Sequence, residues 1–204
     1  FLVAHGADSG HYLSVRTFTE FEEGYEMGII RKALASRPVA SLTSPYTIDH
    51  YLDQIHPMLA AQNVRARVVE VRRETGDAST VVLRPNGTWK GFAPGQHVQF
   101  GVEVEGKRRV RVFSVSSSKA NKGRTFSVSV KAHPEGYVSQ FLHNEMKPGT
   151  IVFLSQAEGE FVLPAEVPDD LLLMSGGSGA TPVMSMITQR ARDLDDLLHR
   201  IIGR

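Results

Sequence analysis

The sequence contains no cysteine, and this absence narrows the chemistry that the chain can perform by itself. A disulfide framework, a thiolate zinc site, a cysteine nucleophile and a cysteine-ligated iron–sulfur cluster are excluded for these 204 residues. The eight histidines show no HxH or HExxH spacing, which favours scattered surface and core histidines over a metal site. We therefore expect no metal, and the lack of cysteine fits a cytoplasmic protein.

The chain also lacks an excess of charge of either sign and any long apolar run. Its formal net charge of +1 gives no reason to expect a nucleic-acid or membrane partner. No run approaches the roughly 18 apolar residues of a membrane span. The basic cluster at Lys107, Arg108, Arg109 and Arg111 has no accompanying ladder of aromatic residues, so a solvated strand face is favoured over a nucleic-acid site.

The N-terminal part has a weak structural pattern. Residues 1–26 show neither a basic n-region nor a sustained apolar h-region, which argues against a signal peptide, and Met27 is a plausible natural start. We expect residues 1–42 to be a weakly structured extension. Residues 43–62 are expected to form a packing helix that opens at Ser44-Pro45 and bends or ends near Pro57. Its apolar positions recur at helical spacing: Ile48, Leu52, Ile55 and Leu59.

Residues 63–166 alternate between short strand-like runs and turn signals. The predicted strands are Val64–Thr75, Ala78–Leu83, Gln96–Val104, Lys107–Ser116, Arg124–Lys131 and Thr150–Leu154. Turns rich in glycine, proline and asparagine separate them, and one helical segment interrupts them at Gly136–Met146. This pattern predicts a six-stranded antiparallel barrel.

After the linker-like stretch Pro164–Pro168, the pattern changes to that of an α/β unit. Leu171–Met174 is a short, wholly apolar run, which is typical of a parallel strand buried on both faces. A glycine turn and a helical segment, Pro182–Arg192, follow. We expect residues 167–204 to be the start of an incomplete doubly wound nucleotide-binding domain, because only the first βα unit is recognisable. Either its remainder is missing or this piece packs on the barrel alone.

The strand Lys107–Ser116 carries candidate binding residues. Side chains alternate along a strand, so Arg109, Arg111 and Phe113 share one face, while Val110, Val112 and Ser114 share the other. Arg111 can clamp a diphosphate oxygen, and Phe113 can cover a flat heterocycle such as the flavin ring. Ser114 closes the strand, where it can reach the flavin N5 edge. The alternative is a basic and aromatic edge strand with a solvated outer face.

Gly136-Tyr137-Val138-Ser139 follows a turn and begins a helix. Helix N-termini offer unpaired N–H donors and a partial positive charge, so they bind anions readily. Gly136 permits close approach, and Ser139 can act as N-cap or as a phosphate donor. The alternative is an ordinary capped helix with Val138 and its apolar neighbours in the core.

Gly176-Gly177-Ser178-Gly179 lies between an apolar run and a helix, as a nucleotide-binding turn does. The alternative is a strand-to-helix turn without a ligand. The same residues approximate the G-x-S-x-G nucleophile elbow of a serine hydrolase, with Ser178 as nucleophile. That mechanism needs an acid and a histidine after the serine, and only His199 follows. A cofactor-free barrel that binds a partner protein is a further alternative.

Taken in order, these segments resemble the ferredoxin reductase-type flavoprotein family, in particular bacterial NAD(P)H-dependent reductases that serve desaturases and oxygenases. The family motif R-x-Y-[ST] appears as Arg111-Val112-Phe113-Ser114, with phenylalanine in place of tyrosine. The flavin-diphosphate motif appears as Gly136-Tyr137-Val138-Ser139, preceded by Val130-Lys131-Ala132. The nicotinamide-domain opening appears as Gly176–Pro182, and Pro94-Gly95-Gln96-His97-Val98 is similar to the family's P-G-Q strand entry.

The resemblance implies an FAD-binding barrel followed by a nicotinamide-nucleotide domain, with NAD(P)H as electron donor. The electron acceptor would be a redox partner, such as an iron–sulfur domain, a desaturase or an oxygenase, that is not part of this chain. Cofactor-binding roles would fall to Arg111, Val112, Phe113, Ser114, Val130, Lys131, Gly136, Tyr137, Val138, Ser139, Gly177, Ser178, Gly179 and Thr181. No catalytic acid or base is required, because the chemistry belongs to the cofactors.

Overall fold

The structure is a computed structural model that describes residue 36 and residues 46–104, 106–118, 124–164, 167–168 and 171–202. The expected N-terminal extension, apart from Ser36, and the helix opening at Ser44-Pro45 lie outside the described residues.

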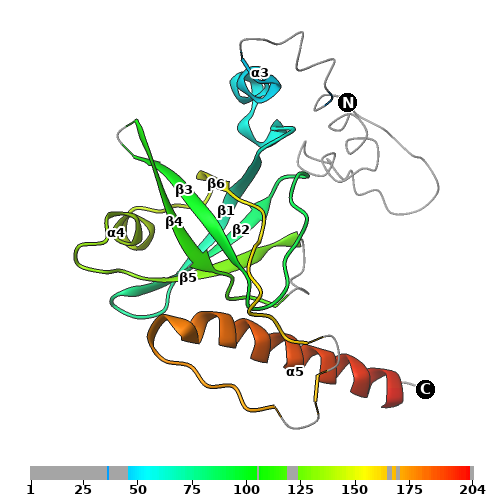
Figure 1. Ribbon diagram of the computed structural model, residues 1–204. Helices are drawn as coiled ribbons and strands as arrows, with labels where there is room; N and C mark the ends of the chain where they lie inside the picture. Colours follow the sequence, from blue (N-terminus) through cyan, green and yellow to red (C-terminus); the bar gives the residue numbers. More distant parts are fainter. Residues whose placement is uncertain are drawn as a thin grey trace, which may run out of the picture.

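Six antiparallel strands form one sheet that curls into a barrel (Figure 1). Their bounds are β1 Val64–Arg73, β2 Ala78–Pro85, β3 His97–Val104, β4 Lys107–Ser114, β5 Phe126–Lys131 and β6 Ile151–Leu154. Neighbouring strands follow the order β4-β3-β6-β1-β2-β5. The predicted barrel and all six of its strands are confirmed, with ends within two residues of those expected.

The barrel closes where the end of β4 meets β5. Val115 bridges Val128, and the N–H of Ser116 donates to the carbonyl of Ser127 at 2.8 Å. Within the described part of the chain, β4 itself pairs only with β3. The rest of β4 is therefore an edge of the sheet, and α4 lies beside this edge.

The barrel interior is filled by the inward-facing residues of each strand, as strand alternation requires. Phe100, Phe126 and Leu83 are fully buried, and Trp89 stacks on Phe126 with ring centroids 4.9 Å apart. Helix α4, Tyr137–Asn144, contributes Val138 and Leu142 to the same core. This packing fixes one face of α4 against the barrel.

Helix α3, Ile48–Ile55, and the short 3₁₀ helix η2, Pro57–Leu59, lie beside β1 (Figure 1). The predicted interruption at Pro57 is confirmed. The buried carboxylate of Asp49 accepts hydrogen bonds from the backbone N–H groups of Ala61 at 2.6 Å and Asn63 at 2.8 Å. These bonds tie α3 to the chain that enters β1.

Helix α5, Ala180–Ile202, lies along the opposite side of the barrel from α3 (Figure 1). Val183 and Met186 are buried, and the hydroxyl of Ser185 donates to the Ser117 carbonyl at 2.6 Å. Gly95 has a φ of +103°, and a Cβ there would collide with the Phe161 carbonyl oxygen and the Met186 side chain. The absence of a side chain at Gly95 therefore lets the loop at Phe161 and helix α5 pack closely against the turn that precedes β3.

The prediction of a buried strand at Leu171–Met174 is wrong for this structure. These residues have no regular secondary structure, and Leu172 and Met174 are 82% and 80% exposed. A parallel strand gains its hydrogen bonds and its cover from neighbouring strands and helices, and the described residues supply none beside this segment. The apolar run therefore remains irregular and exposed. The predicted helix after it is formed by α5, which extends beyond the predicted end at Arg192.

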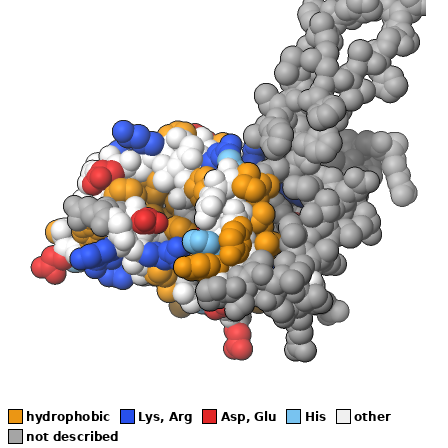
Figure 2. Space-filling model, turned by 90° about the horizontal axis from the view of Figure 1, so that it is seen from above, with side chains coloured by type: hydrophobic (Ala, Val, Ile, Leu, Met, Phe, Trp, Pro, Cys, Tyr) orange, Lys and Arg blue, Asp and Glu red, His pale blue; other side chains and the backbone are white. Residues whose placement is uncertain are grey.

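Figure 2 shows one face of the molecule from above, where acidic and basic side chains lie among apolar ones. None of the described helices is both long and apolar enough to cross a membrane.

Candidate functional site

The register of β3 and β4 places three candidate residues on one face of β4. Val102, Phe100 and Val98 of β3 lie directly opposite Arg109, Arg111 and Phe113 of β4. Directly paired residues of an antiparallel ladder point to the same side, so the two arginines and Phe113 share the inward face with these buried residues. The predicted alternation along β4 is therefore present, with Val110 and Val112 exposed on the outer face.

Phe113 is supported from behind by the core. Its ring lies 5.9 Å from that of Phe100 at an interplanar angle of 86°, an edge-to-face contact. Phe113 remains half-buried, so part of its surface is accessible. Ser114, also half-buried, ends the strand opposite His97. Phe113 therefore offers a partly accessible aromatic surface, and Ser114 follows it at the end of the strand.

The two arginines of this face are exposed. Arg111 donates from Nη1 to the Val110 carbonyl at 2.8 Å, and Arg109 lies over the ring of Tyr137, with its Cζ 5.3 Å from the ring centroid. This contact joins β4 to the first residue of α4. Two segments far apart in the sequence, the R-x-F-S strand and the G-Y-V-S helix start, therefore lie side by side.

The start of α4 differs from the prediction in the role of Ser139. Gly136, and not Ser139, is the N-cap. The Ser139 hydroxyl accepts from the His133 N–H at 3.1 Å and donates to the Gly136 carbonyl at 2.9 Å. A Cβ at position 136 would collide with that hydroxyl, so a larger residue would displace the hydroxyl from its two bonds. The hydroxyl shapes the turn, and the N–H groups of the first helical turn are left as anion donors.

Val130, Lys131 and Val138 have different environments. Val130 and Val138 are 3% and 1% exposed, so their side chains belong to the core and only their backbone can face a ligand. Lys131 is exposed and pairs with Asp77 at 3.3 Å. The alternative interpretation of Val138 as a core residue is thus confirmed, whereas the helix start around it remains accessible.

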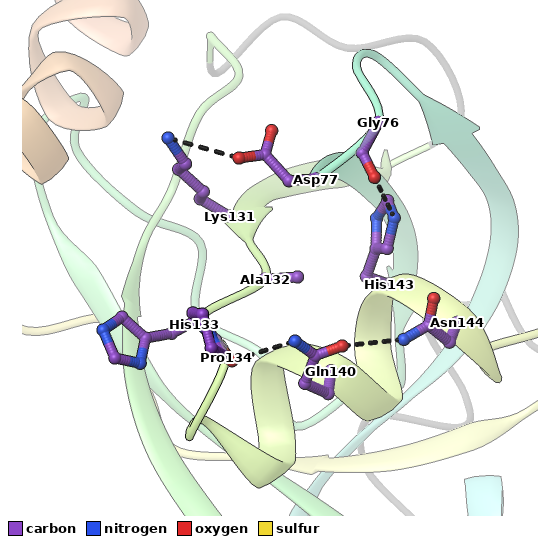
Figure 3. A pocket seen from close by; sticks show the side chains of 9 residues that line it. All are labelled: Gly76, Asp77, Lys131, Ala132, His133, Pro134, Gln140, His143 and Asn144. Atoms are coloured by element: carbon purple, nitrogen blue, oxygen red, sulfur yellow. Dashed lines mark hydrogen bonds and ion pairs between the residues drawn. The ribbon is translucent and has the colours of Figure 1, made fainter.

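A pocket of about 500 Å³ lies between α4, the segment at the end of β5 and the turn at Gly76-Asp77 (Figure 3). It is lined by the turn Gly76-Asp77, the loop Lys131–Pro134 and the α4 side chains Gln140, His143 and Asn144. Gln140 donates to the His133 carbonyl at 3.0 Å and accepts from Asn144 at 2.8 Å. These bonds connect α4 to the loop that leads into it.

His143 lines this pocket and anchors α4 to the barrel. Its Nε2 donates to the Gly76 carbonyl at 3.1 Å, and its Nδ1 lies 2.7 Å from the hydroxyl of Ser79. His143 is 7% exposed and Ser79 is fully buried, so both ring nitrogens are satisfied away from solvent. The histidine is a structural anchor for the C-terminal end of α4.

Asp77 borders the same pocket, and among the described titratable groups it alone has a pKa that departs clearly from its ordinary value. Hydrogen bonding from the Thr75 hydroxyl, followed by the interaction with Lys131, lowers the pKa of Asp77 below 3.8. The carboxylate is exposed, so this displacement stabilises the turn only modestly.

The glycine turn is separate from these elements. Gly177–Gly179 forms a 3₁₀ turn before α5, with Gly177 at φ +56° and nothing within 4 Å of a Cβ built at Gly176 or Gly177. Ser178 is exposed, and Thr181 is half-buried in the first turn of α5. A nucleophile elbow needs a strand before the serine, and that strand is not formed. The geometry therefore offers an open turn and no hydrolase site.

The face of β4 and the start of α4 fit a dinucleotide flavin. An aromatic shelf at Phe113, guanidinium groups at Arg111 and Arg109, and helix N–H donors suit an aromatic ring attached to a diphosphate. Within the described residues, no three histidine or acidic side chains are placed to hold a metal ion.

Comparison with known proteins identifies the class to which this site belongs. Residues 65–163 match the family model of the oxidoreductase FAD-binding domain. An NADPH oxidoreductase of Mycobacterium tuberculosis is 41% identical over 165 residues, which cover 78% of this chain and 43% of that protein. The glycine betaine monooxygenase reductase subunit of Chromohalobacter salexigens is 35% identical over 121 residues, 59% of this chain and 33% of that protein. The barrel is thus an FAD-binding oxidoreductase domain.

Solved structures agree. The flavohem-like FAD/NAD-binding domain of nitric oxide dioxygenase from Vibrio cholerae superposes with a TM-score of 0.56 at 30% identity, covering 65% of this chain and 58% of that one. Residues 65–163 are thus an oxidoreductase FAD-binding domain, and the chain is similar to flavoprotein reductases over this part. It spans less than half the length of the two relatives compared in sequence. The comparisons give no support to the serine hydrolase alternative.

Sequence reasoning missed two contributors to this site. Arg109 was placed on the correct face but given no role, because its contact with Tyr137 joins residues 28 positions apart. His143 was counted among scattered histidines, because its partners Ser79 and Gly76 lie 64 and 67 positions away. No local pattern marks either contact.

Proposed function

We propose that this chain is the flavin-binding part of a reductase that takes electrons from NAD(P)H and passes them to an iron–sulfur or haem partner. The observation that carries the proposal is the contact between Arg109 and Tyr137, which brings the face with Arg111 and Phe113 beside the start of α4. The names of the relatives support the direction of electron flow, since one is an NADPH oxidoreductase and another is the reductase subunit of a monooxygenase.

Bound FAD would supply the capacity to accept a hydride and to release electrons singly. In the proposed pose, Phe113 covers one face of the flavin ring and Ser114 lies at its edge. Arg111 pairs with the diphosphate, together with backbone N–H groups at the start of α4. The backbone of Val130 and Lys131 borders the ring, because these residues lie at the end of β5 beside the open edge of β4.

The glycine turn and α5 are proposed to serve the nicotinamide nucleotide. Gly177, Ser178 and Gly179 leave the N-terminus of α5 open to a phosphate, and Thr181 lies in the first turn of that helix. Side chains on the outer surface of α5 and on the segment before it are apolar and exposed: Leu172, Met174, Met184, Ile187 and Leu194. We propose that they pack against further elements of a nucleotide-binding sheet, in which Leu171–Met174 becomes a strand.

Titration of the purified 204-residue chain with FAD tests the first part of this function. Binding is expected to give a saturable heat signal and a shift in the flavin absorbance bands. Protein that takes up no FAD at high micromolar concentration contradicts the assignment of the site.

Stopped-flow mixing of the FAD-loaded chain with NADH or NADPH tests the second part. Bleaching of the flavin absorbance near 450 nm reports reduction, and the proposed role of the glycine turn requires that a Gly177→Val variant be reduced more slowly while it binds FAD as the parent does. Equal reduction rates in both proteins would remove the turn from the proposal.

A further inference from the structure

We propose that Ser185 of α5 is a positioning residue, whose buried hydrogen bond to the Ser117 carbonyl holds the glycine turn Gly177–Gly179 at a fixed place relative to the flavin site. The inference rests on the proposed function, in which that turn serves the nicotinamide nucleotide. It adds a task for a residue of the second turn of α5, which lies outside every motif considered above: to set the distance between the two cofactor sites.

Helix α5 meets the barrel through one narrow stretch of its surface. Among the α5 side chains that the structure describes, the buried ones all lie in the first two turns: Pro182, Val183, Ser185 and Met186. The described side chains from Ile187 onward are half-buried or exposed. A few neighbouring residues near the start of α5 therefore decide where the helix lies on the barrel.

Ser185 makes the directional contact of this stretch. It is 0% exposed, and its hydroxyl donates to the Ser117 carbonyl at 2.6 Å. The apolar contacts of Val183 and Met186 have no preferred direction and allow a helix to shift along its axis. A hydrogen bond weakens steeply when its geometry is disturbed, and its loss between buried residues is costly. The bond therefore selects one position for α5.

The acceptor, Ser117, is itself fixed to the barrel. Its hydroxyl accepts from the Ser127 N–H of β5 at 3.0 Å, and the N–H of the preceding Ser116 donates to the Ser127 carbonyl at 2.8 Å. Ser117 follows Ser114 by three residues, which span at most about 10 Å. The acceptor therefore belongs to the closure of the barrel, close to the strand end at which the flavin edge is proposed to lie.

The donor is joined to the glycine turn by continuous helix. Because α5 begins at Ala180 and a helix rises 1.5 Å per residue, Gly179 lies about 9 Å from Ser185 along the axis. A shift of α5 at Ser185 therefore moves the turn as well. Reacting atoms must approach to about 3–3.5 Å, and a misplacement of about 1 Å can slow a reaction about a hundredfold. Loss of the bond should thus slow hydride transfer without weakening FAD binding.

A distance measurement between spin labels tests the position of α5 directly. The chain has no cysteine, so Gln99→Cys on β3 and Ser178→Cys in the glycine turn place two labels at exposed positions. Pulsed electron paramagnetic resonance then compares this labelled chain with its Ser185→Ala variant. Thr188→Ala is the matched control, because the Thr188 hydroxyl also donates to a carbonyl, that of Met184 at 2.8 Å, but within α5.

We expect a single narrow distance distribution in the parent and in Thr188→Ala, and a distribution about twice as wide or wider in Ser185→Ala. Unfolding in urea, followed by fluorescence, shows whether the barrel is intact. Its reporter is Trp89, the one tryptophan of the chain, which stacks on Phe126 in the barrel. The midpoint of this transition should be the same in the parent and in both variants.

Stopped-flow mixing of the FAD-loaded chains, without labels, with NADH or NADPH separates positioning from simple packing. Ser185→Ala should lower the limiting rate of flavin reduction about tenfold or more. The Kd for FAD and the NAD(P)H concentration that gives half of the limiting rate should stay within twofold of the parent. Thr188→Ala should match the parent in all three quantities.

A distribution in Ser185→Ala as narrow as that of the parent would overturn the proposal. Flavin reduction at the parental rate in spite of a widened distribution would also overturn it, and so would equal effects of Thr188→Ala. Failure of the parent to bind FAD or to be reduced by NAD(P)H contradicts the proposed function instead. The distance measurement needs neither cofactor, so the two failures are distinguishable.

Discussion

Replacing Arg111 with alanine is the sharpest test of the flavin pose, because the side chain is exposed and contributes little to the fold. Its one described hydrogen bond joins Nη1 to the carbonyl of the preceding residue, Val110. Loss of such an exposed contact changes the free energy of unfolding by no more than about 0.5 kcal/mol. A change in FAD affinity in this variant therefore reports a lost cofactor contact and not a damaged barrel.

The magnitude follows from the charge on the diphosphate. A hydrogen bond to a charged group contributes about 1.5–3 kcal/mol, which corresponds to a 10- to 150-fold increase in the Kd for FAD. Because Arg111 is exposed, part of this interaction is screened by salt, so the effect should shrink as ionic strength rises. Arg111→Lys keeps the charge but loses the planar fork, and should lie between wild type and alanine.

The assay is a calorimetric titration with FAD at low and at high salt. Arg84→Ala is the matched control, since Arg84 is an exposed arginine on β2, which does not neighbour β4 in the sheet order. A Kd for Arg111→Ala within twofold of wild type at low salt, or an equal loss in Arg84→Ala, would refute the assignment of Arg111 to the diphosphate.

Four further outcomes are expected. Phe113→Tyr restores a hydroxyl at the edge of the ring shelf and should tighten FAD binding by about 0.5–1.5 kcal/mol in the same titration. Gly95→Ala should lower the free energy of unfolding by about 2 kcal/mol or more in urea, because of its positive φ and the lack of room for a Cβ. His143→Leu leaves the buried Ser79 hydroxyl without this partner and should cost about 1–3 kcal/mol of stability by the same measurement. Thr75→Val should bring the pKa of Asp77 back toward 3.8 in an NMR titration. Because the native pKa is lowered, the stability that this carboxylate contributes is present above about pH 4 and is lost as the pH falls through the native pKa.

The barrel was predictable because the residue pattern within each short segment is enough to indicate a strand or a turn. Alternating strands and tight turns fix the period of two within each segment, and one-sided burial then fixes which face turns inward. The same alternation predicts that Arg111 and Phe113 share one face, as the register of β3 and β4 confirms. The helix at Gly136–Met146 was equally readable, since its apolar residues recur at helical spacing and its entry is a glycine turn.

The failures arise where structure depends on distant partners. Leu171–Met174 has the composition of a buried strand, but a parallel strand exists only beside others, and the described residues offer none. Ser139 is a local exception: Gly136 is the N-cap, and the Ser139 hydroxyl bonds to His133 and Gly136 in the turn just before it, while its phosphate role stays a prediction. The contact of Arg109 with Tyr137 depends on how β4 and α4 pack together, which no local pattern encodes.

A crystal structure of the chain grown with FAD tests the central claim most directly. The account predicts density for the flavin ring against Phe113 and for the diphosphate between Arg111 and the first turn of α4. Density for FAD in the pocket behind α4, or at the glycine turn before α5 with the face of β4 empty, would contradict it.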